Sequence, residues 1–220
     1  MTSSAKVSYS NEEVVVWLRG LLTIAWADGN YDDEEQALIV DLTQKLAFDD
    51  GSLSALEPIE AADLAKVLGR DRSLAENFLR TAVMVSVADG IYSKPEADLL
   101  EAFDKALGLG VKALKSLEET LYHPEKNKYQ DQEHKLEPLK PIKEWLDGMD
   151  VQDPRVAKFM CRLIPSQCPF ERDVVLFGKK VVHIPAMCKL NPLYEQLVGL
   201  RFRALSYLAD ECDEDVSEFI

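Results

Sequence analysis

Apolar positions recur at helical spacing along the first half of the chain, three or four residues apart and separated by polar residues. Ser-x-x-Glu boxes at Ser10 and Ser93 stand where two of these runs begin, which is typical of helix starts. The pattern predicts a mainly α fold, a helical bundle of about six short helices without strands. The expected helices cover about 10–27, 32–46, 57–69, 73–88, 94–107 and 110–122.

An internal repeat divides this half. The stretch AWADGNYDDEE begins at Ala25 and SVADGIYSKPE begins at Ser86, 61 residues later. Both contain Ala-Asp-Gly-x-Tyr-x-x-x-Glu between two apolar helical runs. Each copy therefore predicts a turn in which glycine ends one helix and the glutamate caps the next.

The repeated carboxylates are also candidate metal ligands. Asp28 and Glu35, with their counterparts Asp89 and Glu96, match the later positions of a calcium-binding EF-hand loop. The first ligand positions of that loop are apolar in both copies, so one copy alone offers too few oxygens. Helix capping is the simpler interpretation. The alternative is one divalent cation shared between the copies, bound by Asp28, Asp32, Asp33, Glu35, Asp89 and Glu96.

The doubled motif resembles the TerB-like family, known from tellurite-resistance proteins and membrane-anchored co-chaperones. The resemblance covers residues about 8–122. It implies an all-helical fold, metal binding by the acidic residues of the motif and a role in stress-linked complexes, without a defined reaction. The residues to which it extends are Asp28, Glu35, Asp89 and Glu96.

Residues 123–152 are polar and proline-rich, which predicts a linker between a first domain at 1–122 and a second at 153–220. A short docking helix is expected near the end of this linker. In the second domain, Asp153-Pro154 opens a helix that stops before Pro165. The runs DVVLF and KVVHI flank Gly178 and predict a β-hairpin.

A long helix is expected after Asn191-Pro192, followed by an acidic tail. The second domain is therefore a small helix–hairpin–helix unit. The predicted buried face of the long helix consists of Leu193, Leu197, Leu200, Ala204, Leu205 and Leu208.

The second domain also holds four potential zinc ligands. Their number suits a tetrahedral site, but structural zinc sites usually pair ligands two to four residues apart. Cysteine is among the most buried residue types, so core packing is the simpler interpretation. The four residues are Cys161, Cys168, His183 and Cys188.

The stretch from Phe159 to Val216 resembles the cyanobacterial family labelled "Mo-dependent nitrogenase C-terminal". The label implies no nitrogenase chemistry here, because the chain has no cluster-binding pattern. The resemblance implies a cyanobacterial cytoplasmic protein that joins a TerB-like bundle to this small domain.

The net charge of −14 is unevenly distributed. Residues 151–209 hold 9 Lys and Arg against 4 Asp and Glu, whereas the tail at 210–220 holds 6 acidic residues and no basic one. The acidic first half disfavours nucleic acid, and the basic second half could meet an acidic partner or an anionic membrane face. The start lacks a secretory signal and no run is long enough to cross a bilayer, which favours the cytoplasm.

These observations predict a non-catalytic adaptor or stress-linked interaction protein that binds a protein partner, with peripheral membrane contact as a further option. No catalytic residue, cofactor site or small-molecule substrate is evident in the sequence. The alternative is a divalent-metal-binding sensor that uses the paired Asp-Gly turns or the Cys/His cluster.

Overall fold

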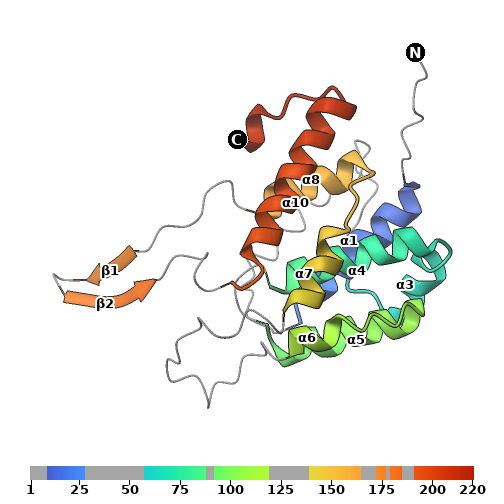
Figure 1. The fold of residues 1–220 in the computed structure, drawn as a ribbon, viewed down its shortest axis with the longest axis horizontal. Coiled ribbons are helices and arrows are strands. Elements are labelled where there is room, and N and C mark those ends of the chain that lie inside the picture. Colours follow the sequence, from blue (N-terminus) through green and yellow to red (C-terminus); the bar gives the residue numbers. More distant parts are fainter. Residues whose placement is uncertain are drawn as a thin grey trace.

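The computed structural model describes residues 9–27, 57–87, 92–118, 139–164, 172–176, 179–184 and 191–220. The fold is mainly helical, as the sequence predicts (Figure 1). The expected helix over 32–46 lies outside the described residues. The helices are α1 (Asn11–Ala25), α3 (Ala61–Leu68), α4 (Arg72–Ser86), α5 (Lys94–Leu107), α6 (Leu114–Glu118), α7 (Lys140–Asp147), α8 (Pro154–Leu163) and α10 (Tyr194–Ser206).

Side-chain caps begin several of these helices where the sequence predicts them. Both expected capping boxes are present: Ser10 pairs with Glu13 at α1, and Ser93 pairs with Glu96 at α5. Asp153 accepts a hydrogen bond from the Arg155 backbone N–H at the start of α8. Each cap satisfies backbone donors that the first helical turn leaves free, which fixes where the helix starts.

The internal repeat is visible in the helices. A shift of 61 residues carries the bounds of α1 onto those of α4. It also carries Trp17 onto Phe78, and these two rings contact each other edge to face, with centroids 5.8 Å apart. Equivalent positions of the two copies therefore pack against each other at the centre of the bundle.

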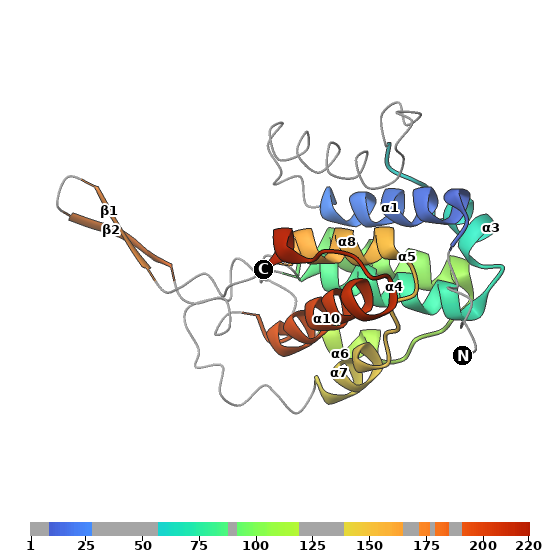
Figure 2. The ribbon, with the colours of Figure 1, turned by 90° about the horizontal axis from the view of Figure 1, so that it is seen from above.

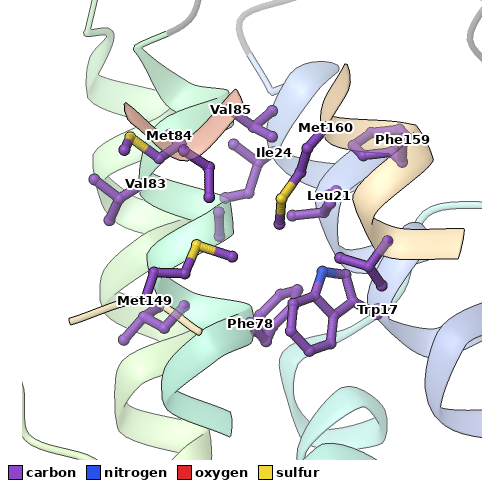
Figure 3. Packing of buried hydrophobic residues seen from close by; sticks show 14 of the residues in the cluster. Trp17, Leu21, Ile24, Phe78, Val83, Met84, Val85, Met149, Phe159 and Met160 are labelled. Atoms are coloured by element: carbon purple, nitrogen blue, oxygen red, sulfur yellow. The ribbon is translucent and has the colours of Figure 1, made fainter. Parts of the chain in front are cut away.

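A row of aromatic rings crosses this core. Tyr9 stacks on Trp17 at 5.3 Å, and Phe78 meets Phe103 of α5 at 5.5 Å. Figure 3 shows Trp17 and Phe78 at one end of the surrounding cluster, with Ile24 of α1 and Val85 of α4 at the other. The C-terminal ends of α1 and α4 thus lie at the same end of the bundle.

The C-terminal part of the chain packs onto the same core. In Figure 2, α8 lies between α1 and α10. Polar contacts also join the two parts: the Tyr9 backbone N–H donates to Asp153, and the Asn191 side chain donates to the Val87 carbonyl. One hydrophobic cluster contains buried residues from both predicted domains and from α7, which lies in the predicted linker. The members of this cluster from α7 onward include Ile142, Leu146, Met149, Val156, Met160, Leu197 and Leu200.

The expected hairpin forms from β1 (Arg172–Leu176) and β2 (Lys179–Ile184), which pair antiparallel. The register shifts between Val174 and Val175, which pair with Val182 and Lys180. This leaves one extra residue in β2, the arrangement of a β-bulge. Figures 1 and 2 both show the hairpin projecting away from the helices. Among the described helices, none is long and apolar enough to span a membrane.

Candidate interaction surface on the last long helix

Helix α10 buries one face and exposes apolar side chains on another. The predicted buried face is confirmed for Leu193, Leu197, Leu200, Ala204 and Leu208, while Leu205 is half-buried. On the outer face, Val198 is 43% exposed and Phe202 is 69% exposed. These two side chains lie one helical turn apart, so they form a continuous apolar area.

The exposed residues Glu195, Val198 and Phe202 of α10 are spaced by three and four positions, which places them on one helix face. We call this face the α10 stripe; it consists of Glu195, Val198 and Phe202, and the half-buried Leu205 continues it. Its centre is apolar. Acidic residues stand at both ends, Glu195 in the first turn of α10 and the exposed Asp210 and Glu211 after its last turn.

A buried arginine fixes α10 to the end of α8. Arg201 is 7% exposed and donates hydrogen bonds to the backbone carbonyl oxygens of Cys161 and Ile164, the latter at 2.8 Å. A third hydrogen bond goes to the carbonyl of Phe219. The last carbonyls of a helix lack intrahelical partners and carry the negative end of its dipole, so a guanidinium there is favourable.

Two further arginines fix the end of α7. Arg203 of α10 donates to the carbonyls of Asp147 and Met149, both at 2.9 Å. Arg80 of α4 donates to the Trp145 carbonyl at 2.9 Å, and its guanidinium lies 5.1 Å from the centre of the Trp145 ring. Hydrogen bonds from Arg201 and Arg203 therefore hold α10 against the ends of α8 and α7.

The acidic tail forms ion pairs with the basic side chains of α8. Lys158 pairs with Glu214 at 2.6 Å, and Arg162 pairs with Glu218 at 3.2 Å. The Arg162 guanidinium also lies 5.2 Å from the centre of the buried Phe219 ring. The basic charge that the sequence shows in this region is thus partly neutralised within the chain itself.

A π-helical turn at Tyr207–Glu211 links α10 to this tail. The Tyr207 hydroxyl donates to the Gln152 carbonyl at 3.0 Å, which connects the turn to the segment before α8. Burial is the main cause that raises the pKa of Tyr207 above its ordinary value, and the neighbouring Cys212 raises it further.

The candidate acidic ligands are only partly described. Asp28, Asp32, Asp33, Glu35 and Asp89 lie outside the described residues. Glu96 is buried, and its carboxylate accepts hydrogen bonds from the Ser93 backbone N–H at 2.8 Å and the Ser93 hydroxyl at 2.6 Å. This carboxylate serves the capping box, as the simpler interpretation predicts.

The candidate zinc ligands are also only partly described. Cys161 is buried in α8, where burial raises the pKa of its thiol, opposed by the charges of Arg201 and Arg162. His183 occupies a backbone position in β2 opposite Asp173. Cys168 and Cys188 lie outside the described residues. Within the ranges that the structure describes, no group of three or more His, Cys, Asp and Glu side chains could hold a metal ion.

Comparison with known proteins identifies the region that carries the α10 stripe. Residues 138–220 match the family model "Mo-dependent nitrogenase C-terminus". The matched residues contain α7, α8, the hairpin, α10 and the tail. The match begins before the predicted domain boundary at residue 153 and does not extend to the TerB-like region, so that resemblance stays a prediction. No curated protein and no solved structure matches the chain.

Two features of residues 138–220 are not predicted from the sequence alone. Phe202 and Val198 fall outside the predicted buried face of α10, so their positions could have indicated an exposed apolar area. The burial of Arg201 could have been indicated as well, because it stands four residues after Leu197 and three before Ala204, on the predicted buried face. Its carbonyl partners could not be predicted, because they come from α8 and the tail.

Proposed function

We propose that the protein is a non-catalytic adaptor that binds a protein partner through the α10 stripe. The observation that carries this proposal is the exposure of Phe202, 69%, on a helix whose opposite face is buried. Its neighbour Val198 extends the apolar area by one turn. The TerB-like resemblance of the first half supports a role in stress-linked complexes.

The geometry suits binding. Burying a phenylalanine side chain is worth about 1.5–3 kcal/mol, and aromatic residues often dominate binding energy at protein interfaces. Because Arg201 and Arg203 already fix α10 to its neighbours, little ordering of the helix is needed when a partner binds.

Charge suggests the chemistry of the partner. On α10 and the turn that follows it, the exposed charged residues are the acidic Glu195, Asp210 and Glu211. The basic Lys158 and Arg162 are already paired with the tail. A segment that combines apolar and basic residues therefore fits the stripe, whereas an acidic partner or membrane face would have to displace the tail from α8.

Photo-crosslinking in cells of the native host tests this proposal. We place p-benzoylphenylalanine at Phe202 in one variant and at Ile220 in another; Ile220 is 81% exposed in the same region but lies off the stripe. The proposal predicts a discrete adduct with another protein from position 202 only. The same set of adducts from both positions, or adducts with the chain itself alone, would refute it.

The second candidate is a divalent-metal sensor. The C-terminal ends of α1 and α4 lie at the same end of the bundle (Figure 3). Each of these ends precedes one of the two acidic turns in the chain, and this arrangement supports the sensor. A cation shared by the turns would raise the melting temperature. The test adds calcium, magnesium, manganese or zinc to the protein and to an Asp28→Asn/Asp89→Asn variant; the sensor predicts a rise that the variant loses.

A further inference from the structure

The tail contacts α8 in a regular pattern. Lys158 and Arg162 stand four positions apart, on one face of α8. Their partners in the tail, Glu214 and Glu218, are separated by the same number of positions. The tail therefore runs alongside α8 in the same direction, which can be followed in Figure 2. The four side chains of these ion pairs stay between 28% and 60% exposed.

One aromatic side chain anchors the tail. Phe219 is 6% exposed and belongs to the hydrophobic cluster, and its ring centre lies 5.2 Å from the Arg162 guanidinium. The buried Arg201 donates to the backbone carbonyl of Phe219. Because Arg201 also donates to two carbonyls at the end of α8, its position does not depend on the tail alone. We call this set of groups, with Lys158, Arg162, Arg201 and the apolar site of the Phe219 ring, the α8 surface.

Side-chain contacts, rather than a ladder of backbone hydrogen bonds, hold the tail against α8. Among the described residues, the backbone–backbone hydrogen bonds of the tail stay within the tail and the turn before it. Examples are the bonds from Glu214 to Leu208 at 3.0 Å and from Phe219 to Val216 at 2.9 Å. Ion pairs of partly exposed side chains contribute little to stability and are screened by salt. A segment with so few contacts opens at a lower free energy than the core.

A turn at Asp213 separates the rest of the tail from the π-helical segment. With a φ of 56°, Asp213 is the one non-glycine residue with a left-handed backbone in the part of the chain that the structure describes. Aspartate adopts this conformation more readily than most residues, but extended and helical backbone remain more favourable. Rotation at this position releases residues 214–220 and leaves α10 in place, because Arg201 and Arg203 still hold it against α8 and α7.

We infer that the α8 surface binds an acidic segment of another protein and that the tail covers it as an internal competitor. The tail shows which chemistry fits: two carboxylates four positions apart, with an aromatic residue directly after the second. Nucleic acid or an anionic membrane fits less well, because the chain as a whole carries a net charge of −14. The α8 surface uses none of the residues of the α10 stripe, so the inference does not depend on the proposed function.

Peptide binding to full-length variants tests this inference. The probe is a fluorescein-labelled, amidated peptide with the sequence of residues 213–220, DEDVSEFI. Phe219→Ser removes the anchor of the tail, whereas Glu214→Lys/Glu218→Lys repels the tail from α8 and keeps the anchor. Fluorescence anisotropy should give each variant at least tenfold higher affinity for the peptide than the unmodified protein has, because there the tail competes at a high effective concentration.

Two further comparisons identify the surface and its specificity. Adding Lys158→Glu/Arg162→Glu to Phe219→Ser should lower the affinity at least tenfold, because the peptide carboxylates then meet like charges. The matched control adds Lys112→Glu/Lys115→Glu, which changes the net charge equally at two exposed positions outside α8, and should leave the affinity unchanged. A second peptide keeps only the two glutamates and the phenylalanine at their spacing, among serine and glycine, and should bind within about threefold of the first.

Three results would overturn the inference, with each variant shown to be folded by circular dichroism. Absent binding to both tail variants, or affinities equal to that of the unmodified protein, would show that the tail covers no peptide-binding surface. Equal losses from Lys158→Glu/Arg162→Glu and from its control would show that overall charge alone attracts the peptide. A dimer of the unmodified protein that the peptide dissociates would assign the α8 surface to the tail of a second copy.

Discussion

Arg201 of α10 donates a hydrogen bond of 2.8 Å to the carbonyl oxygen of Ile164, the residue that caps the end of α8. The same guanidinium reaches the carbonyl of Phe219 near the end of the chain. Among the described residues, no carboxylate forms an ion pair with it. One side chain thus joins α8, α10 and the tail, and the position of the α10 stripe depends on it.

Replacing this arginine should strongly destabilise the fold. Arg201→Met leaves buried carbonyls of α8 and the tail without donors, and each such group costs about 1–3 kcal/mol. We expect the free energy of unfolding, measured in urea, to fall by about 3 kcal/mol or more. The control is Arg72→Met, which removes an arginine whose side chain is largely exposed and pairs with Glu76. This substitution should change the free energy of unfolding little. Equal losses in both variants would contradict this role.

Two glycines should respond in opposite directions to alanine. A Cβ at Gly20 would lie 2.6 Å from Leu64 Cδ1 and 2.7 Å from the Phe78 ring, so Gly20→Ala should cost about 1–3 kcal/mol of stability. At Gly199 in α10 nothing lies within 4 Å, so Gly199→Ala should gain up to about 1 kcal/mol from helix propensity. Thermal unfolding of both variants measures the contrast. A stable Gly20→Ala variant would show that α1, α3 and α4 pack less closely than described.

Alkaline pH should destabilise the protein through its buried phenols. Burial raises the pKa of Tyr9 from 10.0 to about 12, and the nearby Asp153 and Asp150 charges add to this. Between these values the unfolded chain binds fewer protons than the folded one, so stability falls as the pH rises from 10 toward 12. Tyr9→Phe should reduce this slope in urea unfolding while leaving stability below pH 10 nearly unchanged. An identical slope in the variant would exclude Tyr9 as a source.

The capping box of α5 should stabilise the protein without a metal. Ser93→Ala removes the hydroxyl that accepts a hydrogen bond from the Glu96 backbone N–H, a change that typically costs about 1 kcal/mol. The loss should be the same in a chelator and in added calcium, as measured by thermal unfolding. A loss that calcium restores would instead favour a metal ligand role for Glu96.

Local sequence patterns predict much of this fold because capping and helical periodicity are local properties. Ser10, Ser93 and Asp153 cap helices whose N-termini could be located from a few neighbouring residues. The equivalence of α1 and α4 follows from the repeat in the same way. The hairpin could be expected because its two strands adjoin in sequence.

Contacts between distant segments could not be predicted from such patterns. The bond from Tyr9 to Asp153 joins residues 144 positions apart, and no periodicity indicates it. The pairing of Lys158 with Glu214 likewise depends on how the tail folds back onto α8. The candidate surface could be indicated only in part: Phe202 lies outside the predicted buried face of α10, but the extent of its exposure is known only once the neighbours of α10 are in place.

The affinity of the crosslinked partner for purified variants tests the central claim most directly. Phe202→Ser removes the centre of the α10 stripe, and Ile220→Ser removes an equally apolar exposed side chain outside it. The account predicts that Phe202→Ser weakens binding about tenfold or more, as expected when a buried aromatic anchor is lost, while Ile220→Ser has little effect. Equal affinities of the two variants, with both folded, would contradict the assignment of the α10 stripe as the binding surface.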